Sequence, residues 1–599
     1  MPIVNIDLEW LNRLLGKEFP PEVISESLEQ IGCDVEELAE VSRSRCPVCE
    51  DLVEHPVGQQ EVKACTVCGH QSEVPFALVG TTSVVRLDLL AARPDLFDVG
   101  GLARALRGTL GIVSGLPDYP VQPSGLTVHV DPLVADPDSY RPYIHCAVMN
   151  LPEVDDTGLV AIMKLQENLH WGVGRDRKLA SIGVYDMDSL QGDIQYRTLH
   201  PDDEPFVPLG MPGHPMSGRQ ILQEHPKGMA YAHLLAEHHR YPVLLDSRGQ
   251  VLSMPPIINS EETRLKRGTR RVFIDVTGIS DAAARKALNT LVCSLAELGG
   301  AIESVVIRQG QQQRLSPDLT PGRREVDLAE AKRWLGLPLD GESLMGTMRK
   351  MRLDAQPVAG NNGRFEVRYP AYRTDIRHMV DLFEDVAIGY GYSNIEGRLV
   401  PSLTVGQGRP EAEVSARVRQ TLLGLGYTEI MSLPMTSEEH HFERLGLPIQ
   451  ERYPKVSNPK LKAYNVLRTH LMTGLLECLY ENRRRPLPLM LFELDNVCNL
   501  EEGAETGVRE ERRSAFVEMG REAGFASIRT ALDALLHELG KKGRFKAIEH
   551  PSFVPGRAAS FEAGEGIQGI LGEIHPQVLS NFGLTHPVAL AEISLQRIF

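Results

Sequence analysis

The chain has 599 residues, of which 42% are hydrophobic and 24% are charged, with a formal net charge of −17. This length predicts about four packed domains, and the acidic balance excludes a protein that holds nucleic acid through a generally basic surface. The N-terminus has no basic segment followed by an apolar run, and no 18 consecutive residues are apolar. We therefore expect a soluble, cytoplasmic protein with no membrane association.

The first segment of the chain is predicted to form two short helices joined by a Gly-Pro turn. After a shift of 320 residues it aligns without gaps on a later segment, 326–355. The matched positions include Asp7 with Asp327 and Gly16 with Gly336. We interpret the match as two small related modules, one at the N-terminus and one just before residue 370.

Four cysteines lie close together in the sequence at a spacing of C-x2-C-x15-C-x2-C; they are Cys46, Cys49, Cys65 and Cys68. Each C-x2-C pair can offer two thiolates, and four thiolates satisfy tetrahedral zinc in a closed structural site. The chain has nine cysteines and no secretion signal, which argues against a disulfide framework. The spacing predicts a zinc-ribbon-like insertion at about residues 44–72.

The long segment 81–305 is rich in strand-like runs, with helices expected near 157–170 and 281–298. This pattern predicts a mixed α/β domain. The following stretch, 308–325, is poor in apolar residues and contains two prolines, so we expect a connection there.

An acidic helix is predicted to begin at Asp375, with that residue as its N-cap. At about 100° per residue its apolar side chains form one arc, while Asp381, Glu384 and Asp385 share the opposite face. Together the four carboxylates can hold a divalent cation such as Mg²⁺. A solvated acidic helix face is the alternative.

A second boundary is expected at 401–411, followed by amphipathic helices and strands with an exposed charged loop at 501–513. Residues 564–569 read GEGIQG and fit the G-x-G-x-x-G pattern of dinucleotide sites. Because strand-like runs flank this stretch and no helical pattern follows it, we interpret it as a hairpin turn.

Sequence strings spread over nearly the whole chain resemble the β chain of phenylalanyl-tRNA synthetase in its shorter archaeal and eukaryotic form. They include ARPDLFDVGGLARALRGTLG, KLQENLHWGVGRDRKLASIGVYDMD, VLSMPPIINSEET, FIDVTG, YRTDIRHMVDLFEDVAIGYGYSNI, YNVLRTHLMTGLLECLYENRRRP and SFVPGRAASFEAG. The cysteine-rich insertion is not part of this resemblance, so zinc rests on spacing alone.

The resemblance implies an α+β multidomain chain with small helical, winged-helix-like modules. Its expected parts are an N-terminal module with the insertion (1–80), a central editing domain (81–305), a B5-like module with the magnesium residues Asp375, Asp381, Glu384 and Asp385 (306–405), and a catalytically inactive class II synthetase-like core with an antiparallel sheet and helices (406–599). It also implies an (αβ)2 heterotetramer in which the α chain uses ATP to load phenylalanine onto tRNA(Phe).

In this family the central domain of the β chain hydrolyses tyrosine wrongly attached to tRNA(Phe). The residues of the matching strings that we expect to bind and position the substrate are Ser253, Asp275 and Thr277, and strand alternation places Asp275 and Thr277 on one face. Two alternatives are a scaffold that only docks the α chain and tRNA, and a free-standing RNA-binding paralogue.

Overall fold

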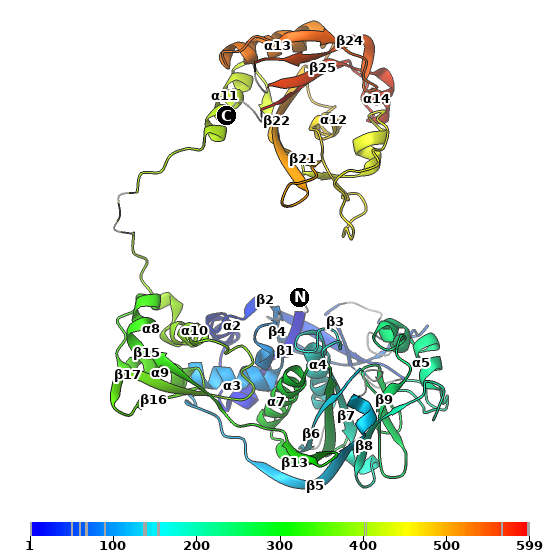
Figure 1. Ribbon diagram of the computed structural model, residues 1–599, viewed down its shortest axis with the longest axis vertical. Helices are drawn as coiled ribbons and strands as arrows, with labels where there is room; N and C mark the ends of the chain where they lie inside the picture. Colours follow the sequence, from blue (N-terminus) through cyan, green and yellow to red (C-terminus); the bar gives the residue numbers. More distant parts are fainter. Residues whose placement is uncertain are drawn as a thin grey trace. The chain divides into compact units, whose positions relative to one another are not determined.

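The computed structural model describes residues 3–48, 52–58, 62–65, 70–88, 91–135, 140–152, 156–400, 402, 404–564 and 567–595. The chain divides into two units, 1–399 and 400–599, which we describe separately. Several sheets with packed helices make up both units (Figure 1), so the predicted α+β class is confirmed.

Two copies of one small module flank the central domain of the first unit. The first copy consists of β1 (Ile3–Asp7), α1 (Leu8–Leu15), α2 (Pro21–Gln30), β2 (Asp34–Arg45), β3 (Leu52–Pro56) and β4 (Ala77–Asp88), in a sheet of order β1-β4-β2-β3. The second consists of β15 (Gly322–Asp327), α8 (Leu328–Leu335), α9 (Gly341–Lys350), β16 (Asp354–Val358) and β17 (Asn361–Tyr369), in a sheet of order β15-β17-β16. When β3 is left out, the two copies have the same order of helices and strands along the chain and the same order of strands in the sheet.

The matched residues explain why the two copies fold alike. The side chains of Asp7 and Asp327 cap α1 and α8 by accepting a backbone N–H from the first turn. Gly16 and Gly336 end those helices in the left-handed region, at φ of 72° and 67°, where glycine carries no steric cost. The predicted repeat is confirmed.

The central domain contains a ten-stranded sheet of order β11-β10-β9-β8-β5-β13-β6-β12-β7, with β14 paired to β13. Its strands are β5 (Val121–Val130), β6 (Tyr143–Asn150), β7 (Ala180–Asp186), β8 (Ile194–Leu199), β9 (Tyr241–Leu245), β10 (Val251–Met254), β11 (Ile258–Asn259), β12 (Arg271–Gly278), β13 (Ala301–Gln309) and β14 (Gln312–Ser316). The helices of this region are α3 (Val99–Thr109), α4 (Asp156–Trp171), α5 (Gly218–Glu224), α6 (Pro226–Tyr231) and α7 (Asp281–Glu297). The helices expected near 157–170 and 281–298 are therefore confirmed.

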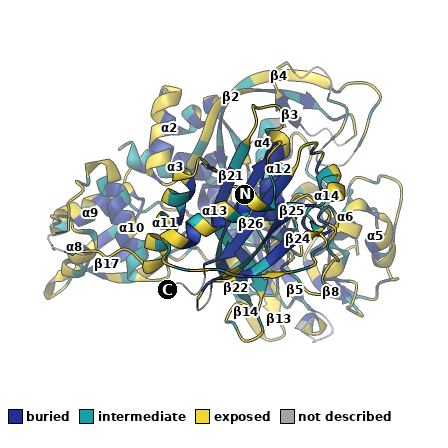
Figure 2. Ribbon diagram, turned by 90° about the horizontal axis from the view of Figure 1, so that it is seen from above, coloured by how far each residue is buried: buried dark blue, intermediate teal, exposed yellow. Residues whose placement is uncertain are grey.

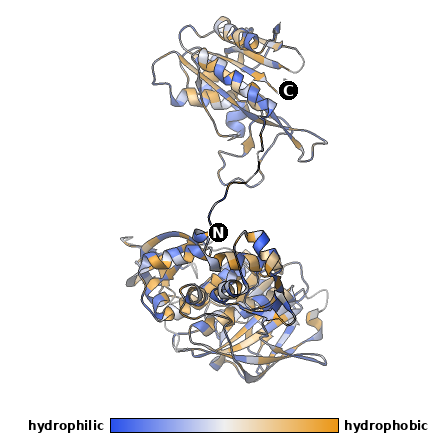
Figure 3. Ribbon diagram, turned by 90° about the vertical axis from the view of Figure 1, so that its left-hand side faces the viewer, coloured by the Kyte–Doolittle hydropathy of each residue, from blue (hydrophilic) through white to orange (hydrophobic). Residues whose placement is uncertain are grey.

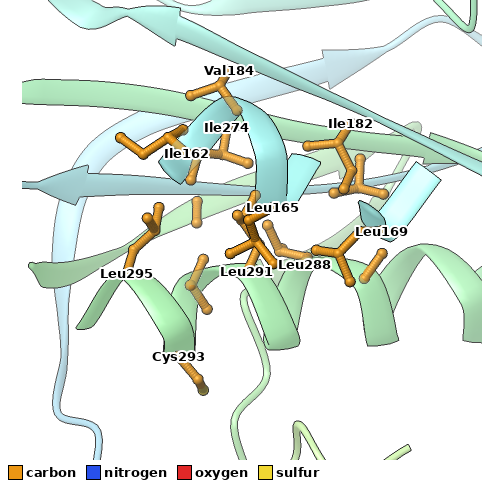
Figure 4. Close-up of a cluster of buried hydrophobic side chains, with 14 of the residues drawn as sticks. Ile162, Leu165, Leu169, Ile182, Val184, Ile274, Leu288, Leu291, Cys293 and Leu295 are labelled. Atoms are coloured by element: carbon orange, nitrogen blue, oxygen red, sulfur yellow. The ribbon is translucent and has the colours of Figure 1, made fainter. Parts of the chain in front are cut away.

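Helices α4 and α7 cover the β6, β12 and β7 part of this sheet with apolar side chains. Figure 4 shows Leu165 and Leu169 of α4 meeting Leu288 and Leu291 of α7 beside Ile274 of β12. Burying such side chains contributes about 1.5–3 kcal/mol each. The even-numbered residues of β12 join this core. Because side chains alternate along a strand, the odd-numbered residues of β12 lie on the other face of the sheet.

The stretch 308–325 is not a plain connection. Its first half forms β14, which pairs antiparallel with β13 at the edge of the sheet. Four of its five residues are not buried, and this exposure explains the polar composition that suggested a linker.

The acidic helix begins later than predicted. α10 runs from Met379 to Tyr390, and its N-cap is His378, whose ring nitrogen accepts the N–H of Val380. Asp375 is therefore not the N-cap, because Arg373 engages its carboxylate outside the helix. The predicted apolar arc is confirmed, since Leu382, Phe383 and Val386 are buried in the core of the second module.

The second unit is built on a seven-stranded sheet of order β18-β21-β22-β26-β25-β24-β23. Its strands are β18 (Thr428–Glu429), β21 (Leu489–Leu500), β22 (Val508–Met519), β23 (Arg544–Ala547), β24 (Phe553–Glu562), β25 (Gln568–Ile574) and β26 (Val588–Ser594), beside a separate pair, β19 (Met435–Thr436) and β20 (Val466–Leu467). The helices α11 (Pro410–Gly424) and α13 (Phe525–Glu538) share one core of this sheet, and α12 (Met472–Glu481) and α14 (Pro576–Asn581) share another. Figure 2 shows the inner strands buried and the outer faces of helices such as α11 exposed.

Gln568 and Gly569 of the glycine-rich segment begin β25, which pairs antiparallel with β24, so the hairpin interpretation is confirmed. The charged loop is shorter than the predicted 501–513, because β21 continues to Leu500 and β22 already begins at Val508.

Hydrophilic residues are interspersed along the helices (Figure 3), and within the described ranges we find no helix with the length and apolarity that crossing a bilayer requires.

Candidate functional site

Three buried polar side chains from three strands of the central sheet meet at one point. The hydroxyl of Tyr185 on β7 lies 2.5 Å from Oδ1 of Asp275 on β12 and 2.7 Å from Oγ of Ser253 on β10. None of the three is more than 2% exposed. The structure thus brings together two of the predicted site residues, and it adds Tyr185, which the sequence analysis missed.

The environment of Asp275 disfavours its charged form. Burial raises the pKa of this carboxyl to about 7, although the hydrogen bond from Tyr185 and the charge of Arg141 act in the opposite direction. A carboxyl with this pKa exchanges its proton near neutral pH. It can therefore present either a donor or an acceptor to a bound hydroxyl group.

This raised pKa predicts a pH-dependent contribution to stability. Between pH 3.8 and about 7 the unfolded chain releases a proton that native Asp275 keeps, so the native state loses stability as pH rises through this window. We expect the melting temperature to fall more between pH 5 and pH 8 in the wild-type protein than in Asp275→Asn. Equal falls in parallel thermal melts would contradict the assignment.

Thr277 lies on the same face of β12 as Asp275, as predicted, but it serves a different cluster. Arg141 is completely buried and donates through Nε to Oγ1 of Thr277 (3.3 Å) and through Nη2 to its backbone oxygen (2.7 Å). Ser181 Oγ lies 3.2 Å from the same hydroxyl. These contacts give Thr277 a structural environment beside the polar trio and outside the cavity next to Asp275.

A cavity of about 50 Å³ adjoins Asp275 and Ser253, and charged side chains from α4 and α6 lie on its other wall. Nε2 of His170 accepts the N–H of Ile182 (2.8 Å), so in the neutral ring Nδ1 carries the proton. Burial and the charge of Arg177 lower the pKa of His170 to about 4, which keeps the ring neutral. Nδ1 has no hydrogen-bond partner among the described residues and lies 3.6 Å from Glu167.

Glu167 is the acceptor at the centre of this wall. Arg177 Nη2 lies 2.7 Å from its Oε1 and Lys227 Nζ lies 3.6 Å away. Burial opposes ionisation here, but the neighbouring His170 ring and the charge of Arg177 hold the pKa of Glu167 well below its usual range. The wall therefore combines a fixed carboxylate, a neutral imidazole donor and two cations.

Two of the four predicted magnesium residues, Asp375 and Asp385, bind one arginine. Arg373 donates to both oxygens of Asp385 (3.1 and 2.9 Å) and to both oxygens of Asp375 (2.9 and 2.6 Å). Asp381 uses Oδ2 to accept the N–H groups of Arg377 and His378, and Glu384 is exposed. The four acids do not converge, and no cluster of three or more metal-ligating side chains forms within the part of the chain that the structure describes.

Of the predicted zinc ligands, Cys49 and Cys68 lie outside the described residues. The other two, Cys46 and Cys65, come from different C-x2-C pairs and are buried in one small core with Val53 and Phe76. The Cys65 N–H donates to the His70 oxygen (2.8 Å). One thiol from each C-x2-C pair is therefore buried in the same small core.

Three domain descriptions match this chain in sequence. They are the B3/4 domain at 169–294, the tRNA synthetase B5 domain at 324–392 and the phenylalanyl tRNA synthetase beta chain CLM domain at 397–595. These domains define a component of a class II aminoacyl-tRNA synthetase.

Curated relatives are similar over most or all of the chain. The phenylalanine–tRNA ligase beta subunit of Methanothrix thermoacetophila is 39% identical over 85% of this chain and 92% of its own length, and that of Methanosphaera stadtmanae is 31% identical over 100% of both. A solved N-terminal fragment of the phenylalanyl-tRNA synthetase beta subunit from Pyrococcus horikoshii is 34% identical, with a TM-score of 0.55 over 65% of this chain and 99% of that one. The chain belongs to the phenylalanine–tRNA ligase beta-subunit family.

Proposed function

We propose that this chain pairs with an α subunit in an (αβ)2 heterotetramer that binds tRNA(Phe), with ATP-dependent synthesis in the α chain. Membership of the beta-subunit family supports this partner. Within the complex, the central domain hydrolyses tyrosyl-tRNA(Phe), and the second unit serves as a non-catalytic core.

The buried trio of Ser253, Tyr185 and Asp275 carries the hydrolytic part of the proposal. Tyrosine differs from phenylalanine by one hydroxyl, and an apolar synthetic pocket rejects an added hydroxyl by only about a hundredfold. A second site that hydrogen-bonds this hydroxyl selects tyrosine, because phenylalanine leaves buried polar groups unpaired. Asp275 offers such a partner, since only its Oδ1 bonds to Tyr185.

The opposite wall suits the ester end of the substrate. His170 presents a neutral N–H donor, and the carboxylate of Glu167 can orient a water molecule toward the ester carbonyl. Lys227 is 37% exposed and can meet the terminal phosphates of tRNA. We assign these residues to binding and positioning.

The test is hydrolysis of tyrosyl-tRNA(Phe) by the α–β complex. We expect Ser253→Ala and Asp275→Ala to lower the hydrolytic kcat/KM by about 10- to 100-fold, because each removes a buried hydrogen-bond partner worth about 1–3 kcal/mol. Phenylalanine charging should not change. Ser343→Ala, which removes an exposed hydroxyl on α9, is the matched control. Unchanged hydrolysis in both test variants would favour the scaffold alternative.

We propose one structural zinc ion in the insertion, held by Cys46, Cys49, Cys65 and Cys68. The joint burial of Cys46 and Cys65 supports it. Elemental analysis should find about one zinc per chain, and Cys46→Ser should lose it, because closed sites of this kind use four thiolates. Wild-type protein without zinc would contradict the proposal, and Cys478→Ser serves as the control.

Magnesium binding at α10 remains a prediction, and fewer carboxylates are available for it than the four predicted. Arg373 neutralises Asp375 and Asp385, so the carboxylates available to an ion are those of Asp381 and Glu384. Mg²⁺ commonly takes one or two carboxylates and keeps several waters. We therefore propose a hydrated ion on this face, supporting structure and distinct from the ion that handles ATP.

A further inference from the structure

The two copies of the small module differ at one hairpin. In the second copy, β16 and β17 follow one another directly, with Val358 paired to Asn361. In the first copy, β2 and β4 are each 12 residues long, and the chain between them adds β3, which pairs with β2 through Arg43 and Glu54. The module folds without this extension, so the extension calls for a separate explanation.

The added strand carries a carboxylate that joins three elements. Oε2 of Glu54 accepts from Asn5 Nδ2 of β1 (3.0 Å) and Lys164 Nζ of α4 (2.8 Å), and Oε1 accepts from Arg43 Nε of β2 (3.2 Å). Its side chain is only 10% exposed. Burial opposes ionisation, but Lys164 above all holds the pKa of Glu54 below its usual value, so the ion pair is charged at neutral pH.

Packing between α4 and the first module is otherwise incomplete. Cavities of about 50 and 400 Å³ lie between them, and both are lined by Asp7 and Arg43 on one side and Thr157 on the other. A partly buried ion pair that spans such a gap contributes more to holding the helix in position than an ion pair at a fully exposed surface does.

The same helix forms a wall of the proposed hydrolytic site. His170 lies six residues after Lys164, which is roughly 9 Å along the helix axis. Gln166 donates to the backbone oxygen of Ile182 (2.7 Å), and His170 accepts the backbone N–H of Ile182. The position of α4 along its own axis therefore determines both contacts with β7. A shift of α4 would therefore move Glu167 and His170 relative to Asp275.

We infer that Glu54 is a positioning residue for the hydrolytic site: through Lys164 it holds α4, and with it Glu167 and His170, in register with β7. This inference rests on the proposed hydrolysis of tyrosyl-tRNA(Phe). It gives the hairpin extension a role in the chemistry of the neighbouring domain.

The test compares Glu54→Gln, Lys164→Met and the double variant in the full α–β complex. Each single change should lower kcat for tyrosyl-tRNA(Phe) hydrolysis about tenfold with a smaller change in KM, since small displacements of reacting groups cost rate. The double variant should lose no more than either single one, because both remove the same contact. Amide exchange of residues 163–171 should accelerate in all three. Glu37→Gln, which breaks an exposed ion pair on the same sheet, is the control.

Two outcomes overturn the inference: an unchanged kcat in both single variants, or losses that add in the double variant. Wild-type complex without hydrolytic activity would refute the proposed function instead. In that case the exchange measurement still decides whether Glu54 holds α4, since unchanged exchange in Glu54→Gln would show that it does not.

Discussion

Gly183→Ala is expected to abolish hydrolysis of tyrosyl-tRNA(Phe), with a loss of at least about a hundredfold, while phenylalanine charging persists. Gly183 lies on β7 directly opposite Asp275. A Cβ at this position would lie 1.9 Å from the Tyr185 hydroxyl and 2.3 Å from Oδ1 of Asp275. Because Tyr185 is fully buried, neither group can move aside without disrupting the trio.

The measurement is a single-turnover hydrolysis assay beside a charging assay on the same preparation. Gly80→Ala is the matched control, because Gly80 also lies in a strand but its Cβ would meet open space. Hydrolysis by Gly183→Ala within about threefold of wild type would show that the close approach of β7 to Asp275 is unimportant, since threefold is less than 1 kcal/mol.

Arg373→Met is expected to have the largest effect on stability. Arg373 and Asp385 have side chains only 3% and 2% exposed, and Arg373 donates two hydrogen bonds to Asp385 and three to Asp375. Removing the arginine leaves a buried carboxylate without its main partner, which typically costs about 3–5 kcal/mol. Urea titration followed by amide exchange of α10 measures this loss.

The double variant Arg373→Met/Asp385→Asn distinguishes lost charge compensation from lost packing. It should recover part of the stability, because the most deeply buried carboxylate, that of Asp385, no longer carries an uncompensated charge. Arg364→Met, at an exposed pair with Glu325, is the control and should change stability by less than about 1 kcal/mol. A loss of that small size in Arg373→Met would contradict the buried network.

Local patterns predicted the parts of the fold that depend on neighbouring residues. Asp7 and Gly16 form a cap and a helix end that any copy of the module needs, so their recurrence at Asp327 and Gly336 revealed the repeat. The start of α10 was mispredicted because it depends on a side-chain contact that the local pattern does not show. Asp375 has the chemistry of an N-cap, but Arg373 binds it, and His378 caps a helix that begins at Met379.

The candidate site was predictable only in part. All four residues lie in strings that carry the family resemblance, but Tyr185 and Gly183 belong to a mostly apolar strand, and no polar pattern there marks them as site residues. Their role depends on the pairing of β7 with β12, about ninety residues apart, which periodicity does not reveal. His170 lies in a matching string, but a lone histidine on an apolar helix gives no signal.

The contrast between the two modules also bears on how this chain can accept new sequence. Residues 359–360 suffice to close the hairpin in one copy, whereas residues 46–76 close it in the other. Each doubling of loop length costs about 0.6 kcal/mol in chain entropy, so roughly four doublings cost on the order of 2 kcal/mol. The tip of this hairpin is therefore a low-cost site for growth, where one copy of a repeated module can gain a new contact while the other copy keeps a short turn.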